Sequence, residues 1–181
     1  VHPSDGTLWV GTEGGGLVVW DTVRQTFEQH VFPGQAGLLS NTIYDIAFDE
    51  RTGDAWLATD FGVTYVERAT MAFRTTVADT ESARPLHSGG VVEAVPIEQF
   101  PDSRIFNAVA VADDGAVWVG SPDRGVAVRG TDGTWRRFIA DEDEPEQGPQ
   151  RSQVADIATL PNGLVWVAHG RTNFGPVVSV Y

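Results

Sequence analysis

The sequence has no cysteine, no lysine and no long apolar run. Without cysteine the chain has neither a disulfide framework nor a thiolate metal site. No segment approaches the roughly 20 apolar residues of a membrane-spanning helix, so membrane insertion is not expected for this segment. The chain opens on Val1 without a basic-then-apolar segment. Any signal peptide is therefore expected to have been removed or to lie outside this segment.

The charge balance is strongly acidic, with 12 basic residues, all arginine, against 25 acidic ones and a net charge of −13. A field of this sign repels phosphate backbones and anionic lipid surfaces. We therefore expect no nucleic-acid partner. Neutral and cationic partners stay open, and the acidity also has the simple interpretation of a solvated surface that keeps the protein soluble.

No metal ion or cofactor is predicted. The four histidines are scattered and show no metal-ligand spacing. An acidic run, Asp-Glu-Asp-Glu at 141–144 followed by Glu146, offers oxygen ligands. It lacks the spacing and the glycine of a calcium loop, and a charge block in a loop is usually solvated.

The main signal is an internal repeat of the form Gly-x-x-Trp. It occurs at residues 6–9, 53–56, 115–118 and 163–166. The intervals between the tryptophans are 47, 62 and 48 residues, which is typical of propeller blades of about 40 to 50 residues with one insertion. We expect these tryptophans, Trp9, Trp56, Trp118 and Trp166, to pack between blades.

The segments around each copy predict four antiparallel strands per unit, which is the pattern of a propeller blade. A short apolar run precedes three of the copies, at 43–48, 105–111 and 154–160, and a turn rich in Asp, Asn and Gly follows each run. Third strands are expected at 17–20, 63–66, 126–128 and 177–180, and fourth strands at 27–32, 73–77 and 135–139.

The fold prediction is therefore an all-β chain, a single partial β-propeller domain over residues 1–181. It holds about three and a half blades: a blade part at 1–37, a blade at 38–78, a blade with a long first connection at 79–140, and a blade part at 141–181. Propellers have four to eight blades. A ring of seven would need on the order of 330 residues, so the rest of the same propeller or another protein chain is expected to complete the blades.

Two copies carry a family resemblance. The segments Leu38-Leu-Ser-Asn-Thr-Ile43, Gly53-Asp-Ala-Trp56-Leu-Ala-Thr59 and Gly6-Thr-Leu-Trp9-Val-Gly-Thr12 resemble the repeat of the two-component regulator propellers. The resemblance covers nearly the whole chain but weakens toward its end, where Ser121 and His169 replace the threonine. It implies a periplasmic or extracellular sensor region that often recognises saccharides, and it does not imply catalysis.

The candidate site lies on the side where the long connections gather, because binding residues concentrate on loops carried by a rigid scaffold. Carboxylate, arginine and aromatic side chains there suit a small polar or sugar-like ligand. Aspartate and asparagine are also what any tight turn prefers. The residues predicted to bind the ligand are Glu13, Asp60, Phe61, Asp123, Arg124, His169, Arg171 and Asn173.

Two other functions stay open. In the first, the chain is an interaction or assembly subunit. Apolar residues at 91–92 and 95–97, in the long connection 78–104, are then expected to pack against another protein. In the second it is a lyase, because streptogramin lyases share a similar repeat. That function expects His169 to act as a general base within reach of a carboxylate such as Asp123 or Glu13. No recognised catalytic constellation supports it.

Overall fold

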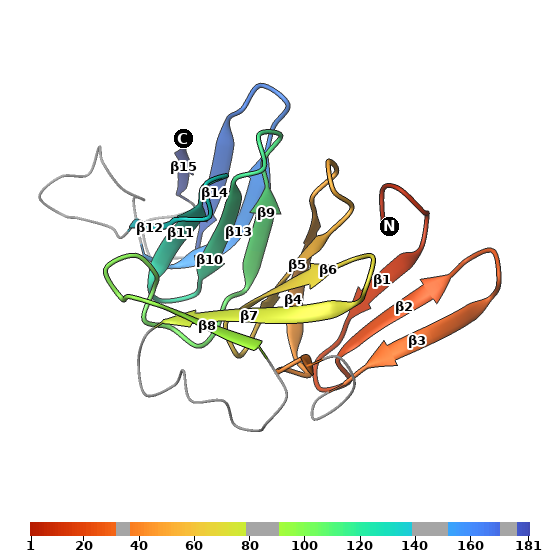
Figure 1. Cartoon of the computed structure of the whole chain (residues 1–181). Coiled ribbons are helices and arrows are strands. Elements are labelled where there is room, and N and C mark those ends of the chain that lie inside the picture. The colour runs from red at the N-terminus through yellow and green to blue at the C-terminus, as the bar shows by residue number, and fades with distance from the viewer. Residues whose placement is uncertain (32–36, 79–90, 139–151, 171–176) are drawn as a thin grey trace, which may run out of the picture.

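The computed structural model describes residues 1–31, 37–78, 91–138, 152–170 and 177–181, and there it holds four β-sheets (Figure 1). The first sheet holds β1 (Leu8–Gly11), β2 (Leu17–Asp21) and β3 (Thr26–His30). The second holds β4 (Ile43–Phe48), β5 (Ala55–Thr59), β6 (Val63–Glu67), β7 (Ala72–Ala78) and β8 (Val91–Val95). The third holds β9 (Ala108–Val111), β10 (Val117–Ser121), β11 (Gly125–Arg129) and β12 (Trp135–Phe138), and the fourth holds β13 (Val154–Thr159), β14 (Val165–His169) and β15 (Val178–Val180). The prediction of an all-β propeller piece is confirmed.

The strand order within the sheets is the up-and-down order of propeller blades, β1-β2-β3, β9 to β12 in sequence order, and β13-β14-β15. One strand begins later than expected. The run predicted at 105–111 pairs within its own sheet only from Ala108, because the backbone N–H of Phe106 donates to the carbonyl of Thr59 in the second sheet.

The second sheet has a fifth strand that sequence reasoning missed. β8 pairs in parallel with β7, in the register Arg74 to Val91 through Ala78 to Val95. Val95 is buried among the core residues between the second and third sheets, and Val92 packs on a small cluster that includes Val77. The expectation that this stretch is a loop whose apolar residues are buried against another chain is therefore wrong for Val95.

The two sides of the molecule carry different connections. The turns 49–54, 112–116 and 160–164, which follow the first strand of a blade, lie together at the top of Figure 1, and we call this the turn side. Connections 12–16, 60–62 and 122–124 lie on the opposite, loop side. The turns explain the glycine of the repeat, because Gly53 and Gly115 have φ of 78° and 91°, where a β-carbon is unfavourable.

Apolar cores fill the spaces between neighbouring sheets. Trp9 lies 5.5 Å from the ring of Phe48 between the first and second sheets, and Trp56 lies 6.3 Å from Trp135 between the second and third. Trp118 packs against Tyr181 beside the fourth sheet. Trp166 is 46% exposed. No described strand covers the face of the fourth sheet that carries Trp166, so its packing between blades stays a prediction.

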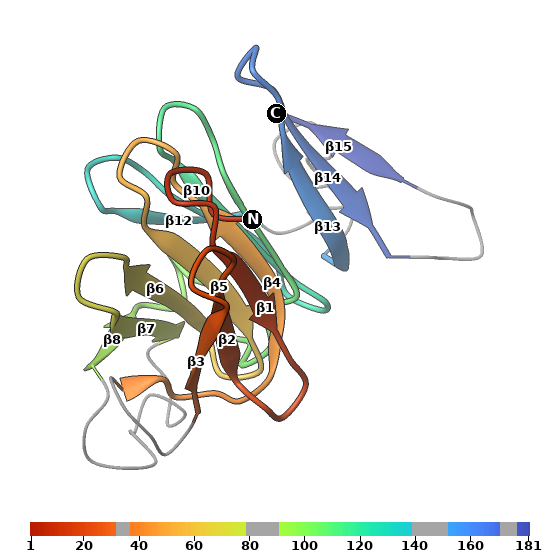
Figure 2. The ribbon, with the colours of Figure 1, turned by 90° about the vertical axis from the view of Figure 1, so that its right-hand side faces the viewer.

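Side chains also join the innermost strands of neighbouring sheets. The carboxylate of Asp45 on β4 accepts the backbone N–H of Val109 on β9 at 2.8 Å. The amide of Asn107 donates to the carbonyl of Val154 on β13 at 3.0 Å. These bonds link the second sheet to the third and the third to the fourth. The sheet of β13 to β15 lies at one end of the set (Figure 2).

Candidate functional site

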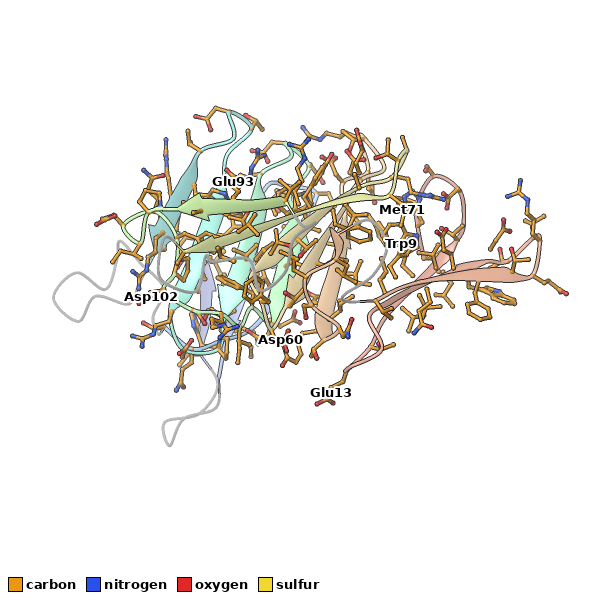
Figure 3. All side chains as sticks on the ribbon, turned by 60° about the horizontal axis from the view of Figure 1, so that its bottom comes forward. Trp9, Glu13, Asp60, Met71, Glu93 and Asp102 are labelled. Carbon is orange, nitrogen blue, oxygen red and sulfur yellow. The ribbon has the colours of Figure 1, made fainter. Side chains whose placement is uncertain are left out.

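The structure places the described residues of the predicted site on the loop side. Glu13 and Asp60 lie in the lower part of Figure 3, and Glu93 lies in its upper part. Glu13 forms an isolated β-bridge with Thr42, which leads into the second sheet. Arg171 and Asn173 lie outside the described residues.

Asp60 and Asp123 occupy the same kind of position in two sheets. Each aspartate lies in a turn and accepts a hydrogen bond from the segment that leads into its own sheet. The hydroxyl of Ser40 donates to Asp60, and the hydroxyl of Ser103 donates to Asp123 at 3.1 Å; in both cases the serine precedes the aspartate by 20 residues. The guanidinium of Arg124 lies 3.5 Å from Asp123. These contacts give both aspartates a structural role, and their binding of a ligand stays a prediction.

Phe61 and His169 are largely enclosed. Phe61 is 5% exposed within a cluster of Leu39, Val77 and Val92, and the Arg104 guanidinium lies 5.2 Å from the centre of its ring. Little of the ring is left to stack on a ligand.

The imidazole of His169 is 5% exposed and is engaged through both of its nitrogens. Nε2 lies 2.8 Å from the Ser179 hydroxyl, and Nδ1 lies 3.3 Å from the carbonyl of Gln153. These partners are a hydroxyl and a carbonyl of its own sheet and the segment before it, which is the pattern of a histidine that holds structure.

A groove on the other side of the molecule was not predicted. It lies between the second and third sheets, with residues of the turns 49–54 and 112–116 in its lining, and has a volume of about 500 Å³, which is within the range of small-molecule sites. We call it the second groove. Its lining includes charged, aromatic and hydroxyl side chains: Asp49, Arg51, Thr52, Asp54, Trp56, Tyr65, Glu67, Arg74, Glu93, Arg129 and Thr131.

The register of the second sheet explains the floor of this groove. Trp56 pairs with Tyr65, and Tyr65 pairs with Arg74, so the three side chains stand in one row on the face toward the third sheet. From the third sheet Arg129 places its guanidinium carbon 5.6 Å from the centre of the Trp56 ring. The groove thus combines aromatic surface with cationic groups.

Hydrogen bonds fix the turn end of the groove. Arg51 donates to both carboxylate oxygens of Asp49 and, at 2.6 Å, to the carbonyl of Asp114 in a turn of the third sheet. The hydroxyl of Tyr65 donates to Asp54 at 2.7 Å. Burial, and then this bond to a carboxylate, raise the pKa of Tyr65 well above its ordinary value, so the phenol stays neutral.

A corresponding groove of about 370 Å³ lies between the first and second sheets, and we call it the first groove. Here Arg68 places its guanidinium carbon 5.9 Å from the centre of the Trp9 ring. Arg68 also donates through Nε and Nη2 to Asp5, at 2.9 and 2.7 Å. The arginine over the tryptophan therefore has a carboxylate partner in this groove.

No protein-family model matches the chain, and no curated protein matches its sequence. Solved structures do match. The extracellular domain of the hybrid two-component system BT3049 from B. thetaiotaomicron has a TM-score of 0.67 at 19% identity, over 99% of this chain and 21% of its own. PorZ, a surface component of the type-IX secretion system of Porphyromonas gingivalis, has a TM-score of 0.58 at 15% identity, and the match covers 97% of this chain and 26% of PorZ. An auxiliary nutrient binding protein from Bacteroides thetaiotaomicron has a TM-score of 0.57 at 9% identity, and the match covers 97% of this chain and 38% of that protein.

These likenesses show the propeller fold of the chain, which spans only 21% to 38% of the length of these three neighbours. They include the extracellular domain of a two-component system, a secretion-system component and a nutrient binding protein. Among the described residues no helix has the length and hydropathy of a membrane span.

Proposed function

We propose that this chain is a recognition module, the part of a larger β-propeller protein that binds a small polar ligand, and that it lies outside the cytoplasm as a region of a sensor. The observation that carries the proposal is the second groove, which joins aromatic surface, free arginines and carboxylates in about 500 Å³. The resemblance of the repeat to two-component regulator propellers and the likeness to an extracellular sensor domain support the same role.

The first test is the thermal stability of the 181-residue chain with a panel of neutral sugars, sugar acids, amino acids and polyamines. A ligand that binds only the folded chain raises its melting temperature by mass action. We expect at least one compound class to do so. A panel with no shift in any class, checked by calorimetric titration, would contradict the recognition role.

Two charge-neutralising variants locate the site once a ligand is found. Glu93→Gln changes the second groove, and Glu13→Gln changes the loop side; both side chains are exposed, so folding should be unaffected. We expect Glu93→Gln to weaken binding and Glu13→Gln to leave it unchanged. The reverse result would return the site to the residues predicted from the sequence.

A second function, assembly with further protein, is favoured by apolar residues that stay exposed on the outward faces of the first and fourth sheets. These residues are Leu8, Val10, Phe27, Trp166, Val178 and Val180. The partner we propose is a further blade, from the rest of the same propeller or from another chain. Light scattering tests it: self-association that the substitution Phe27→Ser relieves supports an adhesive face, and a monomer at all concentrations contradicts it.

A further inference from the structure

Two arginines of the second groove have no acidic partner within the part of the chain that the structure describes. Among the residues that the structure describes, no carboxylate forms an ion pair with Arg74 or Arg129. Arg129 reaches the groove from the end of β11 and Arg74 from β7, so the two cations come from opposite walls. In a chain with a net charge of −13, two guanidinium groups without carboxylate partners in one groove need an explanation.

The first groove is an internal control for this feature. There the arginine over the tryptophan, Arg68, is bonded to Asp5. Asp5 stands four residues before Trp9, and the residue four before Trp56 is Thr52, which also lines the second groove. The repeat thus has an acid four residues before Trp9 and a neutral residue four residues before Trp56, over which Arg129 lies.

The carboxylates at the turn end of the second groove are already engaged. Asp49 accepts two hydrogen bonds from Arg51, and Asp54 accepts the phenol of Tyr65. Glu67 accepts the hydroxyl of Thr70. Glu93 lies on the outermost strand, β8. Asp54 and Glu67 keep their charges, because their donors are neutral hydroxyls. The cationic groups of this groove without an ion pair among the described residues are the guanidiniums of Arg74 and Arg129, and Glu93 and Thr131 also line the groove.

We propose that the second groove binds a small hydroxylated carboxylate, of the chemical class of the sugar acids, with Arg129 and Arg74 as its anchors. A guanidinium fork matches a carboxylate in two parallel hydrogen bonds. The hydroxyl groups of such a ligand donate to Glu93 and accept from Thr131, and its apolar ring face packs on Tyr65. This inference rests on the proposed recognition function and names the class of its ligand.

The test is calorimetric titration of the 181-residue chain with glucuronate, and with glucose as a neutral ring of the same size. Binding of glucuronate well above that of glucose is expected. Arg129→Gln and Arg74→Gln should each weaken it by at least about tenfold, because each removes charge-assisted hydrogen bonds.

Arg68→Gln and Arg24→Gln are the matched controls, since they remove the same charge outside the second groove. They should bind glucuronate as wild type does, at a temperature where circular dichroism shows every variant folded. Glucose binding as tightly as glucuronate, or groove variants that bind like the controls, would overturn the ligand class while leaving a recognition role intact. Binding of no compound at all would contradict both the class and the proposed function.

Discussion

The first and second grooves each lie between neighbouring sheets and are each lined by an arginine that lies over a repeat tryptophan, but the two arginines differ in their acidic partner. In each, an arginine from the following sheet lies over the repeat tryptophan, Arg68 over Trp9 at 5.9 Å and Arg129 over Trp56 at 5.6 Å. Asp5 forms an ion pair with Arg68, and no described carboxylate forms one with Arg129. A repeat fold can therefore hold a structural contact and a candidate ligand site at corresponding places.

The two arginines do not come from the same position of the repeat. Arg68 follows the end of β6, and Arg129 is the last residue of β11. Both reach the preceding tryptophan because sheets stacked in series bring the end of a third strand beside it. The stacking contact is worth about 0.5–1 kcal/mol at exposed sites, so the contact alone does not account for an arginine that lacks a partner.

The largest expected effect concerns the repeat tryptophans. It tests whether a tryptophan stabilises the fold because it is buried between sheets, rather than because it belongs to the repeat motif. Trp56→Ala should lower the free energy of unfolding by about 3–5 kcal/mol, since a ring that is 6% exposed is lost from a packed core. Trp166→Ala, at 46% exposure, should cost under about 1 kcal/mol. Guanidinium chloride unfolding measures both. Equal losses would contradict the packing described between the sheets.

The next effect concerns the acid that distinguishes the first groove. Asp5→Asn removes the ion pair with Arg68, whose side chains are 33% and 32% exposed. Solvent screening keeps the expected loss of stability to about 1 kcal/mol. Urea unfolding at neutral pH checks it, with Asp132→Asn, an exposed aspartate that also bonds a threonine two residues on, as the control. A loss no larger than the control's would show that the pair contributes nothing.

The pH dependence of this effect has a definite sign. Burial raises the pKa of Asp5, but bonds from Thr7 and Arg68 outweigh it and lower the pKa from 3.8 to about 2. A carboxyl whose pKa is lower in the folded chain stabilises it above the unfolded value and loses that effect as pH falls through the folded value. The stability difference between wild type and Asp5→Asn should therefore be constant above about pH 5 and shrink between about pH 4 and 2. A difference that grows in acid would contradict the assignment.

The smallest expected effect separates the two sides of the molecule. Ser103→Ala removes the hydroxyl that joins the segment entering the third sheet to Asp123 at 3.1 Å. One exposed hydrogen bond is worth about 0.5–1 kcal/mol. Urea unfolding should show that small loss, and titration should show unchanged ligand binding. Weaker binding with unchanged stability would give the loop side a part in recognition.

Most of the fold could be predicted because the glycine and the tryptophan of the repeat each have a physical role in a blade. Glycine marks each turn where φ is positive, and the tryptophan three residues later is the second residue of its strand, on the face toward the next sheet where one is described. β8 was missed because four strands already complete a blade, whereas the open edge of β7 accepts a further strand. The packing of Trp166 could not be tested, because no described sheet follows the fourth one.

The candidate site was harder to predict, for reasons of packing. Long polar connections pointed to the loop side, but Asp60 and Asp123 there hold turn hydrogen bonds. Arg129 and Trp56 lie far apart in the sequence and meet only when two sheets stack. A sequence signal existed in the unlike residues at one repeat position, Asp5 and Thr52, and it gains meaning only once the arginine above each tryptophan is known.

The most direct test of this account moves the acid from one groove to the other. Thr52→Asp places a carboxylate at the position that Asp5 holds before its own tryptophan. We predict that glucuronate binding, measured by calorimetric titration, falls at least about tenfold, because Thr52 lines the second groove together with Arg129, and a carboxylate there repels an anionic ligand and competes for the guanidinium. Unchanged binding by a folded Thr52→Asp chain would contradict the claim that a free Arg129 makes the second groove a ligand site.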